Sequence, residues 1–377
     1  MQIVIVGGGL VGASAAVAAV RAGHQVTLLE RGAKPDAETA KSDWDLRISS
    51  VHKKNVEWLE QIGVWAHVEA QKFLSYDGLS VTTRDRQKLR FAADEVNAER
   101  LGVMVENVAL VRACWQVLRT HDAVKLLAET EVKSYDLEQR AITLSNGQTL
   151  NYDLLLGADG ANSAVAKAAG IGMRGWDYGM RCLLAIAEVE QPLPTETWEV
   201  FRADGPYALL PLGEHLACLI DYRAEEEWHN ATKAEVEQKL QVTFADVIGP
   251  YKLQKQASFP LRRQRALRYF DARGVALIGD AAHSIHPLAG QGVNLGFADV
   301  QALFARLAAE PFTSALASYE RQQVRVNQQM MRAMDAIHYG FRSEHLLPRA
   351  AIALGLGAVA QIKPLKHQII KTAMGWT

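Results

Sequence analysis

The ten residues IVIVGGGLVG at positions 3–12 decide the fold of this 377-residue chain. The apolar, β-branched residues 3–6 are typical of a strand buried in a parallel sheet. The glycines at 7, 9 and 12 have the spacing G-x-G-x-x-G, and the alanine-rich stretch 13–22 favours a helix. Gln25–Leu29 predicts a second strand, which ends at Glu30. Strand, glycine turn, helix, strand and acid in this order predict a dinucleotide-binding unit.

Each position of this unit has a physical role. Gly7 permits a tight turn, Gly9 lets the backbone approach a diphosphate, and Gly12 lets the helix pack closely on the strand. The helix N-terminus then faces the phosphates. The carboxylate of Glu30 can accept hydrogen bonds from a ribose but would repel a 2′-phosphate, which disfavours NADP in this site.

Composition excludes several classes of protein. Lys and Arg number 41 and Asp and Glu number 42, a balance that argues against a nucleic-acid binder. The 49% hydrophobic and 22% charged residues indicate a globular chain. The three cysteines, Cys114, Cys182 and Cys218, are scattered. They disfavour a disulfide framework or a structural zinc site and favour a reducing, cytoplasmic location.

Two later segments repeat the pattern of a buried strand followed by an aspartate. YDLLLG at 152–157 leads to Asp159 and Gly160, and GVALIG at 274–279 leads to Asp280. Such strand ends form the rim where open α/β sheets bind ligands. A dinucleotide with a hydroxylated linker would reach from the first glycines to Asp280, which favours FAD over NAD. The chain has no second complete unit of this type, which disfavours the disulfide-reductase class of flavoenzyme.

At these residues the sequence resembles the FAD-dependent aromatic hydroxylases, the p-hydroxybenzoate hydroxylase-like family. Within that family it is most similar to the ubiquinone-biosynthesis hydroxylases. The resemblance covers nearly the whole chain and is carried by five segments: DLRIS at 45–49, LEQIGVW at 59–65, MVEN at 104–107, GADGANS at 157–163 and GDAAHSIHPLAGQGVNLG at 279–296.

The resemblance implies an α/β fold, with a Rossmann-like FAD-binding domain, an inserted and mainly antiparallel β-sheet substrate domain, and C-terminal helices. The expected boundaries are 1–72, 97–180 and 265–330 for the discontinuous FAD-binding domain, 73–96 and 181–264 for the substrate domain, and 331–377 for the helical region. Strand-like runs between residues 198 and 222 fit the inserted sheet. Leu210, Pro211 and Leu212 would line the substrate pocket or, equally, belong to the sheet core.

The resemblance also implies the cofactor-binding residues. Glu30 would hold the adenosine ribose, Arg47 would lie near the flavin or its phosphates, and Asp280 would bind the ribitol. Asn107 would contact the FAD linker, with Arg112 as the alternative. The full expected set is Gly7, Gly9, Leu10, Val11, Gly12, Glu30, Arg31, Arg47, Asn107, Arg112, Asp159, Gly160, Gly279, Asp280, Pro287, Gly290, Gln291, Gly292, Val293 and Asn294.

The implied reaction is hydroxylation of the ring of a prenylated phenol or quinol in ubiquinone biosynthesis, with NAD(P)H and O2 as co-substrates and through a flavin C4a-hydroperoxide. The protein positions the substrate against the cofactor, excludes water from the site and provides the electrostatic environment of the reaction. Pro287, His283 and Arg47 are the expected catalytic residues. His283 and His286 are candidate bases, although hydrogen bonding within the loop is the more common role for such a residue. No third ligand accompanies this histidine pair, so we expect no metal site.

Alternatives remain open for the C-terminal region and for the activity. The apolar and basic stretch 346–376 predicts a helical pair that packs on the body, lies on a membrane surface or docks a partner. We expect a cytoplasmic protein, with peripheral contact to the inner membrane or to other ubiquinone-biosynthesis proteins as an alternative. A flavin oxidase or dehydrogenase acting on another apolar substrate is a second functional hypothesis. A flavin-binding scaffold of a quinone-biosynthesis assembly is the third.

Overall fold

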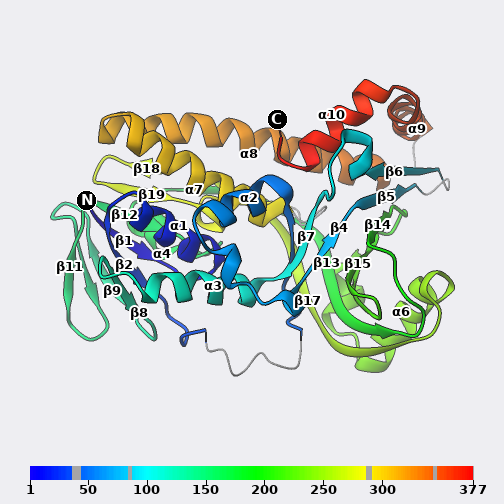
Figure 1. The fold of residues 1–377 in the computed structure, drawn as a ribbon, viewed down its shortest axis with the longest axis horizontal. Helices are drawn as coiled ribbons and strands as arrows, with labels where there is room; N and C mark the ends of the chain where they lie inside the picture. Colours follow the sequence, from blue (N-terminus) through cyan, green and yellow to red (C-terminus); the bar gives the residue numbers. More distant parts are fainter. Residues whose placement is uncertain (36–43, 84–86, 286–290, 343–345, 377) are drawn as a thin grey trace.

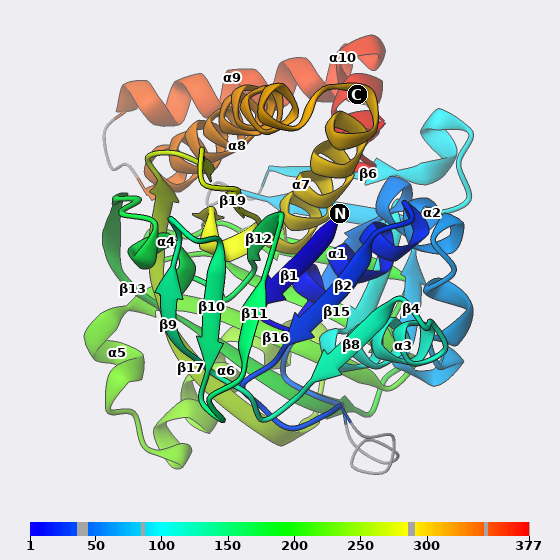
Figure 2. The ribbon, with the colours of Figure 1, turned by 90° about the vertical axis from the view of Figure 1, so that its left-hand side faces the viewer.

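The computed structural model describes residues 1–35, 44–83, 87–285, 291–342 and 346–376. Two large sheets lie side by side, with the long helix α8 running along one side of both (Figures 1 and 2). The helices are α1 (Leu10–Arg21), α2 (Lys53–Gln61), α3 (Asn107–Arg119), α4 (Ala164–Ala168), α5 (Glu225–His229), α6 (Lys233–Ile248), α7 (Gln291–Ala309), α8 (Phe312–Arg342), α9 (Leu346–Gln361) and α10 (Lys363–Ala373). Short 3-10 turns are η2 (Trp65–His67), η3 (Ala70–Lys72), η4 (Ala93–Val96) and η5 (Gly279–Ala281).

The first sheet is the predicted nucleotide-binding sheet. Its strand order is β18 (Phe270–Asp271), β19 (Val275–Leu277), β12 (Leu154–Gly157), β1 (Gln2–Val6), β2 (Gln25–Leu29) and β8 (Val124–Leu127). All neighbours are parallel except β18 and β19. The strands expected at 3–6, 25–29, 152–157 and 274–279 are therefore confirmed as four adjacent strands. Because parallel strands end at one edge, the glycine turn, Glu30, Asp159 and Asp280 meet there.

The second sheet is mainly antiparallel, as expected for the inserted domain. Its order is β20 (His283–Ser284), β17 (Tyr251–Ala266), β13 (Met173–Val189), β16 (Leu216–Ala224), β15 (Tyr207–Gly213), β14 (Glu196–Val200), β5 (Gly78–Thr82) and β6 (Lys88–Ala92). The segment 73–96 contributes β5 and β6 through a parallel pairing of β5 with β14. The strand β4 (Phe73–Tyr76) instead pairs with β7 (Gly102–Glu106), which also pairs with β3 (Ile48–His52).

The two faces of the second sheet have different partners. Along β13, β15 and β16, alternate side chains point to opposite faces. Those of the outer face, such as Leu183, Leu209 and Leu219, pack against α6. Those of the inner face, such as Leu210 and Cys218, belong to a cluster that includes side chains of β3 and β7. The inner face is therefore directed toward the nucleotide-binding part of the molecule.

Smaller elements complete the fold. The strands β9 (Val132–Asp136), β10 (Ala141–Leu144) and β11 (Thr149–Asn151) form a separate antiparallel sheet beside the first one. At the C-terminus, α10 buries Ile370 and Met374 in the inner-face cluster, so the C-terminal region packs on the body. Among the described residues, no helix combines the length and apolarity needed to cross a bilayer.

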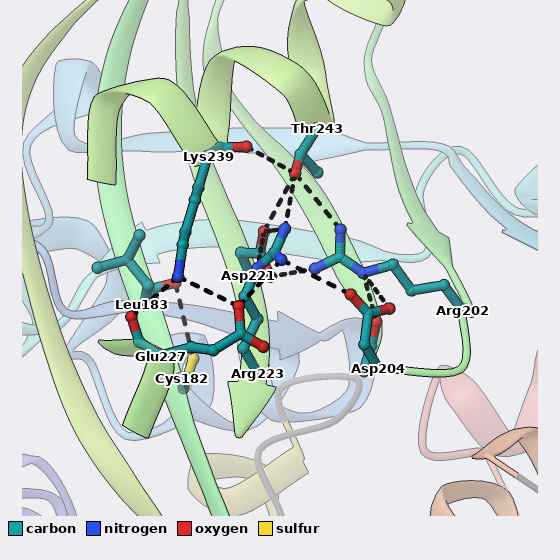
Figure 3. A network of polar contacts seen from close by, with 10 residues as sticks. Cys182, Leu183, Arg202, Asp204, Asp221, Arg223, Glu227, Lys239 and Thr243 are labelled. Atoms are coloured by element: carbon teal, nitrogen blue, oxygen red, sulfur yellow. Dashed lines mark hydrogen bonds and ion pairs between the residues drawn. The ribbon is translucent and has the colours of Figure 1, made fainter. Parts of the chain in front are cut away.

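A charged network fixes α5 and α6 to the outer face (Figure 3). Asp221 of β16 is fully buried and pairs with Arg202 and with Arg223, whose Nε lies 3.3 Å from the carboxylate. Thr243 of α6 donates its hydroxyl to the same carboxylate at 3.3 Å. The buried carboxylate is therefore compensated by two cations and one hydroxyl donor, as burial of a charge requires.

We expect Asp221→Ala to destabilise the protein by about 3–5 kcal/mol, because it leaves two arginines without their buried partner. The matched control is Asp204→Ala. Asp204 pairs with the same Arg202 at 3.0 Å but is 49% exposed, so its loss should cost at most about 1 kcal/mol. Urea unfolding of both variants measures the difference. Equal costs for the two variants would contradict the role given to Asp221.

Candidate functional site

The glycine turn between β1 and α1 brings three backbone segments into close contact. Gly7 has φ +106°, and a Cβ added there would lie 2.3 Å from the carbonyl oxygen of Ala158. A Cβ on Gly12 would lie 1.9 Å from the carbonyl oxygen of Gly7. Only glycine fits at either position. The turn therefore holds β1, β12 and α1 at their closest possible approach.

Gly9 is different, because a Cβ added there meets no atom within 4 Å. This residue is the N-cap of α1 and provides no side-chain cap, so the first N–H groups of the helix have no side-chain acceptor. Those N–H groups and the helix dipole make the turn an anion-binding element. Gly9 lines the cavities on both sides of the turn.

The first cavity has a volume of about 440 Å³ and lies beside the ends of β1, β2 and β12. Glu30 and Arg31 line it, together with Asp159. The Glu30 carboxylate accepts hydrogen bonds from the backbone N–H of Gly8 and of Gly32, both at 2.7 Å. These bonds fix the carboxylate at the cavity wall, where it can accept further bonds from ligand hydroxyls.

Asp159 links this cavity to the start of α4. Its carboxylate accepts from the Ser163 hydroxyl at 2.5 Å and from the backbone N–H groups of Ala164 and Val165 at 2.7 and 3.2 Å. The next residue, Gly160, has φ +82° and open space around it. The acid thus orders the turn, and the glycine lets the backbone line the second cavity.

The second cavity has a volume of about 610 Å³. Asp280 of η5 and Arg47 line it, with Asn107 at the start of α3. Asn107 accepts a hydrogen bond from the Ser49 hydroxyl at 2.5 Å, and its backbone N–H donates to the carbonyl of Arg47 at 2.9 Å. Desolvation within the protein raises the pKa of Asp280, while His283 and Arg47 oppose this rise. The expected residues Leu10, Val11, Gly160, Gly292 and Val293 line the same cavity.

The two cavities meet at the glycine turn, since Gly9 and Ala158 line both. One groove therefore connects Glu30 at one end with Asp280 at the other. Val11 packs between two glycines at the Asp280 end of this groove. A Cβ added to Gly279 would lie 3.2 Å from the Val11 side chain, and a Cβ added to Gly296 would lie 2.6 Å from it. Small residues at both positions let α1, η5 and α7 approach one another.

His283 does not line either cavity. It is 1% exposed, and its Nε2 lies 2.5 Å from the carboxylate of the fully buried Asp299. The same carboxylate oxygen accepts from the backbone N–H of Gly279 at 2.9 Å. Burial alone would lower the pKa of His283, but Asp299 raises it above its ordinary value. This placement favours a role in holding the η5 turn, the alternative that the sequence left open.

The remaining predicted residues have other surroundings. Arg112 lines neither cavity and lies 3.5 Å from Glu69 and 3.7 Å from Glu106, so the placement favours Asn107 for contact with a linker. Asn294 is buried, and its side chain bonds the backbone of β3 and the side chain of Asn55. Pro287, Gly290 and His286 lie outside the described residues, as does the side chain of Gln291.

Leu210 and Leu212 belong to the inner-face cluster, which also contains Ile48. Ile48 lines the Asp280 cavity, so this cluster reaches the cavity wall. Pro211 lies between them, where the pairing of β15 with β16 shifts register. The structure thus connects Leu210 and Leu212 with the cavity through packing.

Several lining residues escaped the sequence analysis. Thr130 and Tyr135 line the first cavity, and Ser284 and Ile285 line the second. Thr130 follows β8, a parallel strand beside β2. The apolar run VKLL at 124–127 was the available signal, because the residues after such a strand lie on the same rim.

The groove fits FAD by its own geometry. Gly9 leaves free space at a helix N-terminus, as a diphosphate requires, and acidic side chains stand on both sides, as two polyhydroxylated arms require. Glu30 and Asp159 would hold the adenosine half. Asp280, Arg47 and Asn107 would hold the flavin half.

Comparisons with known proteins agree with this interpretation. A family model described as FAD binding domain matches residues 1–334. The chain is 37% identical to the 3-demethoxyubiquinol 3-hydroxylase of Escherichia coli strain K12, over 99% of this chain and 98% of that protein. It is 30% identical to the rat ubiquinone biosynthesis monooxygenase COQ6, over 99% and 90%. The crystal structure of p-nitrophenol 4-monooxygenase PnpA from Pseudomonas putida DLL-E4 has a similar fold, with a TM-score of 0.82 and 17% identity over 99% and 97% of the chains.

The two glycines of the turn should respond differently to substitution. We expect Gly9→Ala to fold normally, because space is free, but to weaken FAD binding by about tenfold, equivalent to about 1.4 kcal/mol. Gly12→Ala should prevent correct folding, because its Cβ would clash with the Gly7 carbonyl. Flavin fluorescence titration and circular dichroism measure the two effects. Tight FAD binding by Gly12→Ala would contradict this geometry.

The buried His283–Asp299 pair should make stability depend on pH. The folded pKa of His283 is raised above its unfolded value of about 6.5, so the pair stabilises the fold fully below that pH. This contribution is lost as the pH rises through the folded pKa. We expect Asp299→Asn to cost about 3–5 kcal/mol at about pH 6 and less at alkaline pH. Urea unfolding across pH measures the cost; a cost that grows with pH would contradict the assignment.

Proposed function

The chain belongs to the FAD-binding domain family, and we propose that it is an FAD-dependent monooxygenase that hydroxylates the ring of a prenylated quinol in ubiquinone biosynthesis. Two full-length relatives support this proposal, one named for hydroxylation of demethoxyubiquinol and one for ubiquinone biosynthesis. The co-substrates are O2 and NAD(P)H. The relative named for hydroxylation of demethoxyubiquinol favours a demethoxy-type quinol as the substrate.

The observation that carries the proposal is the pair of adjoining cavities that share Gly9 and Ala158, the first lined by Glu30 and the second by Asp280. A single dinucleotide would have its diphosphate at Gly9 and its second ring system at the Asp280 end. That end lies next to the inner-face cluster of the second sheet, through Ile48. A reacting ring would therefore lie between the cofactor end of the groove and an apolar sheet face.

Bound FAD supplies the redox chemistry, which comprises reduction by NAD(P)H and activation of O2. The residues of this chain provide binding and orientation. The start of α1 binds the diphosphate through its free N–H groups. Arg47, in the wall of the second cavity, supplies positive charge beside the flavin half. Leu210 and Leu212 contribute apolar surface that excludes water from the reacting ring.

We also propose that the protein works at the inner face of the cytoplasmic membrane, where a prenylated substrate resides. The exposed apolar side chains of the C-terminal helices support this location. Leu354 is 76% exposed, Ile362 50% and Leu365 40%. Lys363 and Lys371 stand among them and could contact anionic headgroups or an acidic partner of the same pathway.

The direct test supplies the purified holoprotein with NAD(P)H, a demethoxy-type quinol and isotopically labelled O2. We expect one labelled oxygen atom on the ring of the product, detected by mass spectrometry. A protein that oxidises NAD(P)H and releases only hydrogen peroxide with every quinol tested would contradict hydroxylase activity. The quinone precursor accumulated by a strain lacking this protein identifies the ring carbon that is hydroxylated.

A further inference from the structure

Glu199 is an unusual carboxylate of the second sheet. It lies in β14 between Ala208 of β15 and Val81 of β5 and is only 9% exposed. The preceding residue, Trp198, packs on the outer face against Phe244 of α6, with ring centroids 6.0 Å apart. Because side chains alternate along a strand, Glu199 points to the inner face.

Within the described part of the chain, this carboxylate takes part in no hydrogen bond or ion pair, and burial is the sole cause of its pKa shift. The other buried acids among the described residues differ in this respect, and one of them, Asp271, pairs with Arg273 at 2.6 Å. Asp221 has two arginines, Asp299 has His283, and Glu106 has Lys72 at 3.4 Å. A buried carboxylate without a partner is costly for the fold, so its retention indicates a partner that arrives from outside.

Packed side chains connect the region around Glu199 with the Asp280 cavity. Phe201, which follows directly after β14 and lies two residues beyond Glu199, clusters with Val81, Met330 and Met334. Met330 also packs against the cluster of Ile285, which lines the Asp280 cavity. Phe201 is therefore connected, through Met330, with the cluster that contains the cavity residue Ile285.

The titratable neighbours of Glu199 do not ionise near neutral pH. Burial raises the pKa of Cys218 to about 12 and holds the pKa values of Cys182 and Tyr222 well above their ordinary values. The strands on either side present Val81 and Ala208. On α8 the residues packed with Phe201 are apolar, while Asp335 is paired with Arg263. On the outer face, Asp221 is neutralised by arginines.

We propose that Glu199 is the catalytic base of the hydroxylation, accepting the hydroxyl proton of the bound phenol or quinol. This inference rests on the proposed function and names the residue that activates the substrate. The O–H bond of the ring breaks, the proton moves to a carboxylate oxygen of Glu199, and the electron pair stays on the ring oxygen. When the aromatic product re-forms, the C–H proton of the hydroxylated carbon is lost to solvent and the proton held by Glu199 returns to the ring oxygen, so Glu199 ends the cycle ionised.

The electrostatics of the site suit this exchange. Burial alone raises the pKa of Glu199 to about 8, which brings it closer to the pKa of a phenol, about 10. A base with a pKa near the working pH transfers protons most effectively. An ionised ring oxygen increases the electron density of the ring and so makes the ring carbon a stronger nucleophile toward the oxygen that bound FAD would supply.

The test compares wild type with Glu199→Gln, Glu199→Asp and the control Glu226→Gln, which removes an exposed carboxylate of the same inserted domain. Single-turnover oxygen insertion is followed from pH 6 to 10, and substrate affinity and flavin reduction are measured separately. We expect Glu199→Gln to slow insertion by about 100-fold or more. Substrate affinity and flavin reduction should stay within about twofold, an energy change below 0.5 kcal/mol. Glu199→Asp should retain part of the rate, and Glu226→Gln all of it.

A ring-fluorinated quinol analogue, already ionised at the assay pH, distinguishes a base from a structural residue. With Glu199→Gln, we expect this analogue to restore most of the rate of oxygen insertion. With wild type, we expect the rate of oxygen insertion into this analogue not to rise with pH. The wild-type measurement applies even if the variant folds poorly. Equal losses for both substrates, or an unchanged pH profile in Glu199→Gln, would overturn the inference. A wild type that inserts no oxygen would instead contradict the proposed function.

Discussion

The contact between the backbone at Gly7 and the residues around it is the constraint on which the rest of the structure depends. Gly7 lies against the carbonyl of Ala158, and Gly12 lies against the carbonyl of Gly7, with no room for a Cβ at either place. This contact sets the distance between β1, β12 and α1. It therefore fixes where the helix N-terminus points and where the two halves of the groove meet.

The buried carboxylates of this protein fall into two groups, those with a charged partner within the fold and one without such a partner. Asp221 and Asp299 are compensated within the fold, the first by two arginines that hold helices to the outer face and the second by His283 beneath η5. Such pairs contribute to a defined structure. Glu199 has no such compensation and points to the inner face, where the substrate is expected. Buried carboxylates thus have different roles according to their partners.

Much of the fold could be predicted from the sequence because its signals are local. The strands β1, β2, β12 and β19 are short apolar runs, and the glycine spacing identifies the turn between the first strand and its helix. Asp280 and Asn107 could be anticipated because they belong to motifs that resemble a known family. The membership of the segment 73–96 in the inserted domain was expected from the resemblance, but the parallel pairing of β5 with β14 was not, because a strand signal does not identify the partner strand.

The finer features of the site depend on tertiary packing. His283 of β20 stands in a motif near Asp280, yet its side chain points to Asp299 of α7. Glu199 carries no motif, and only the alternation of β14 between two packed faces reveals where it points. Burial and missing partners are properties of the assembled sheet, so a sequence pattern cannot show them.

The most direct test of the central claim, that one groove holds a single FAD, is a crystal structure of the holoprotein. We expect the adenosine half beside Glu30, the diphosphate at the start of α1, and the flavin ring at the Asp280 end beneath the inner face of the second sheet. A flavin bound elsewhere, or a groove closed between Gly9 and Asp280, would contradict the claim.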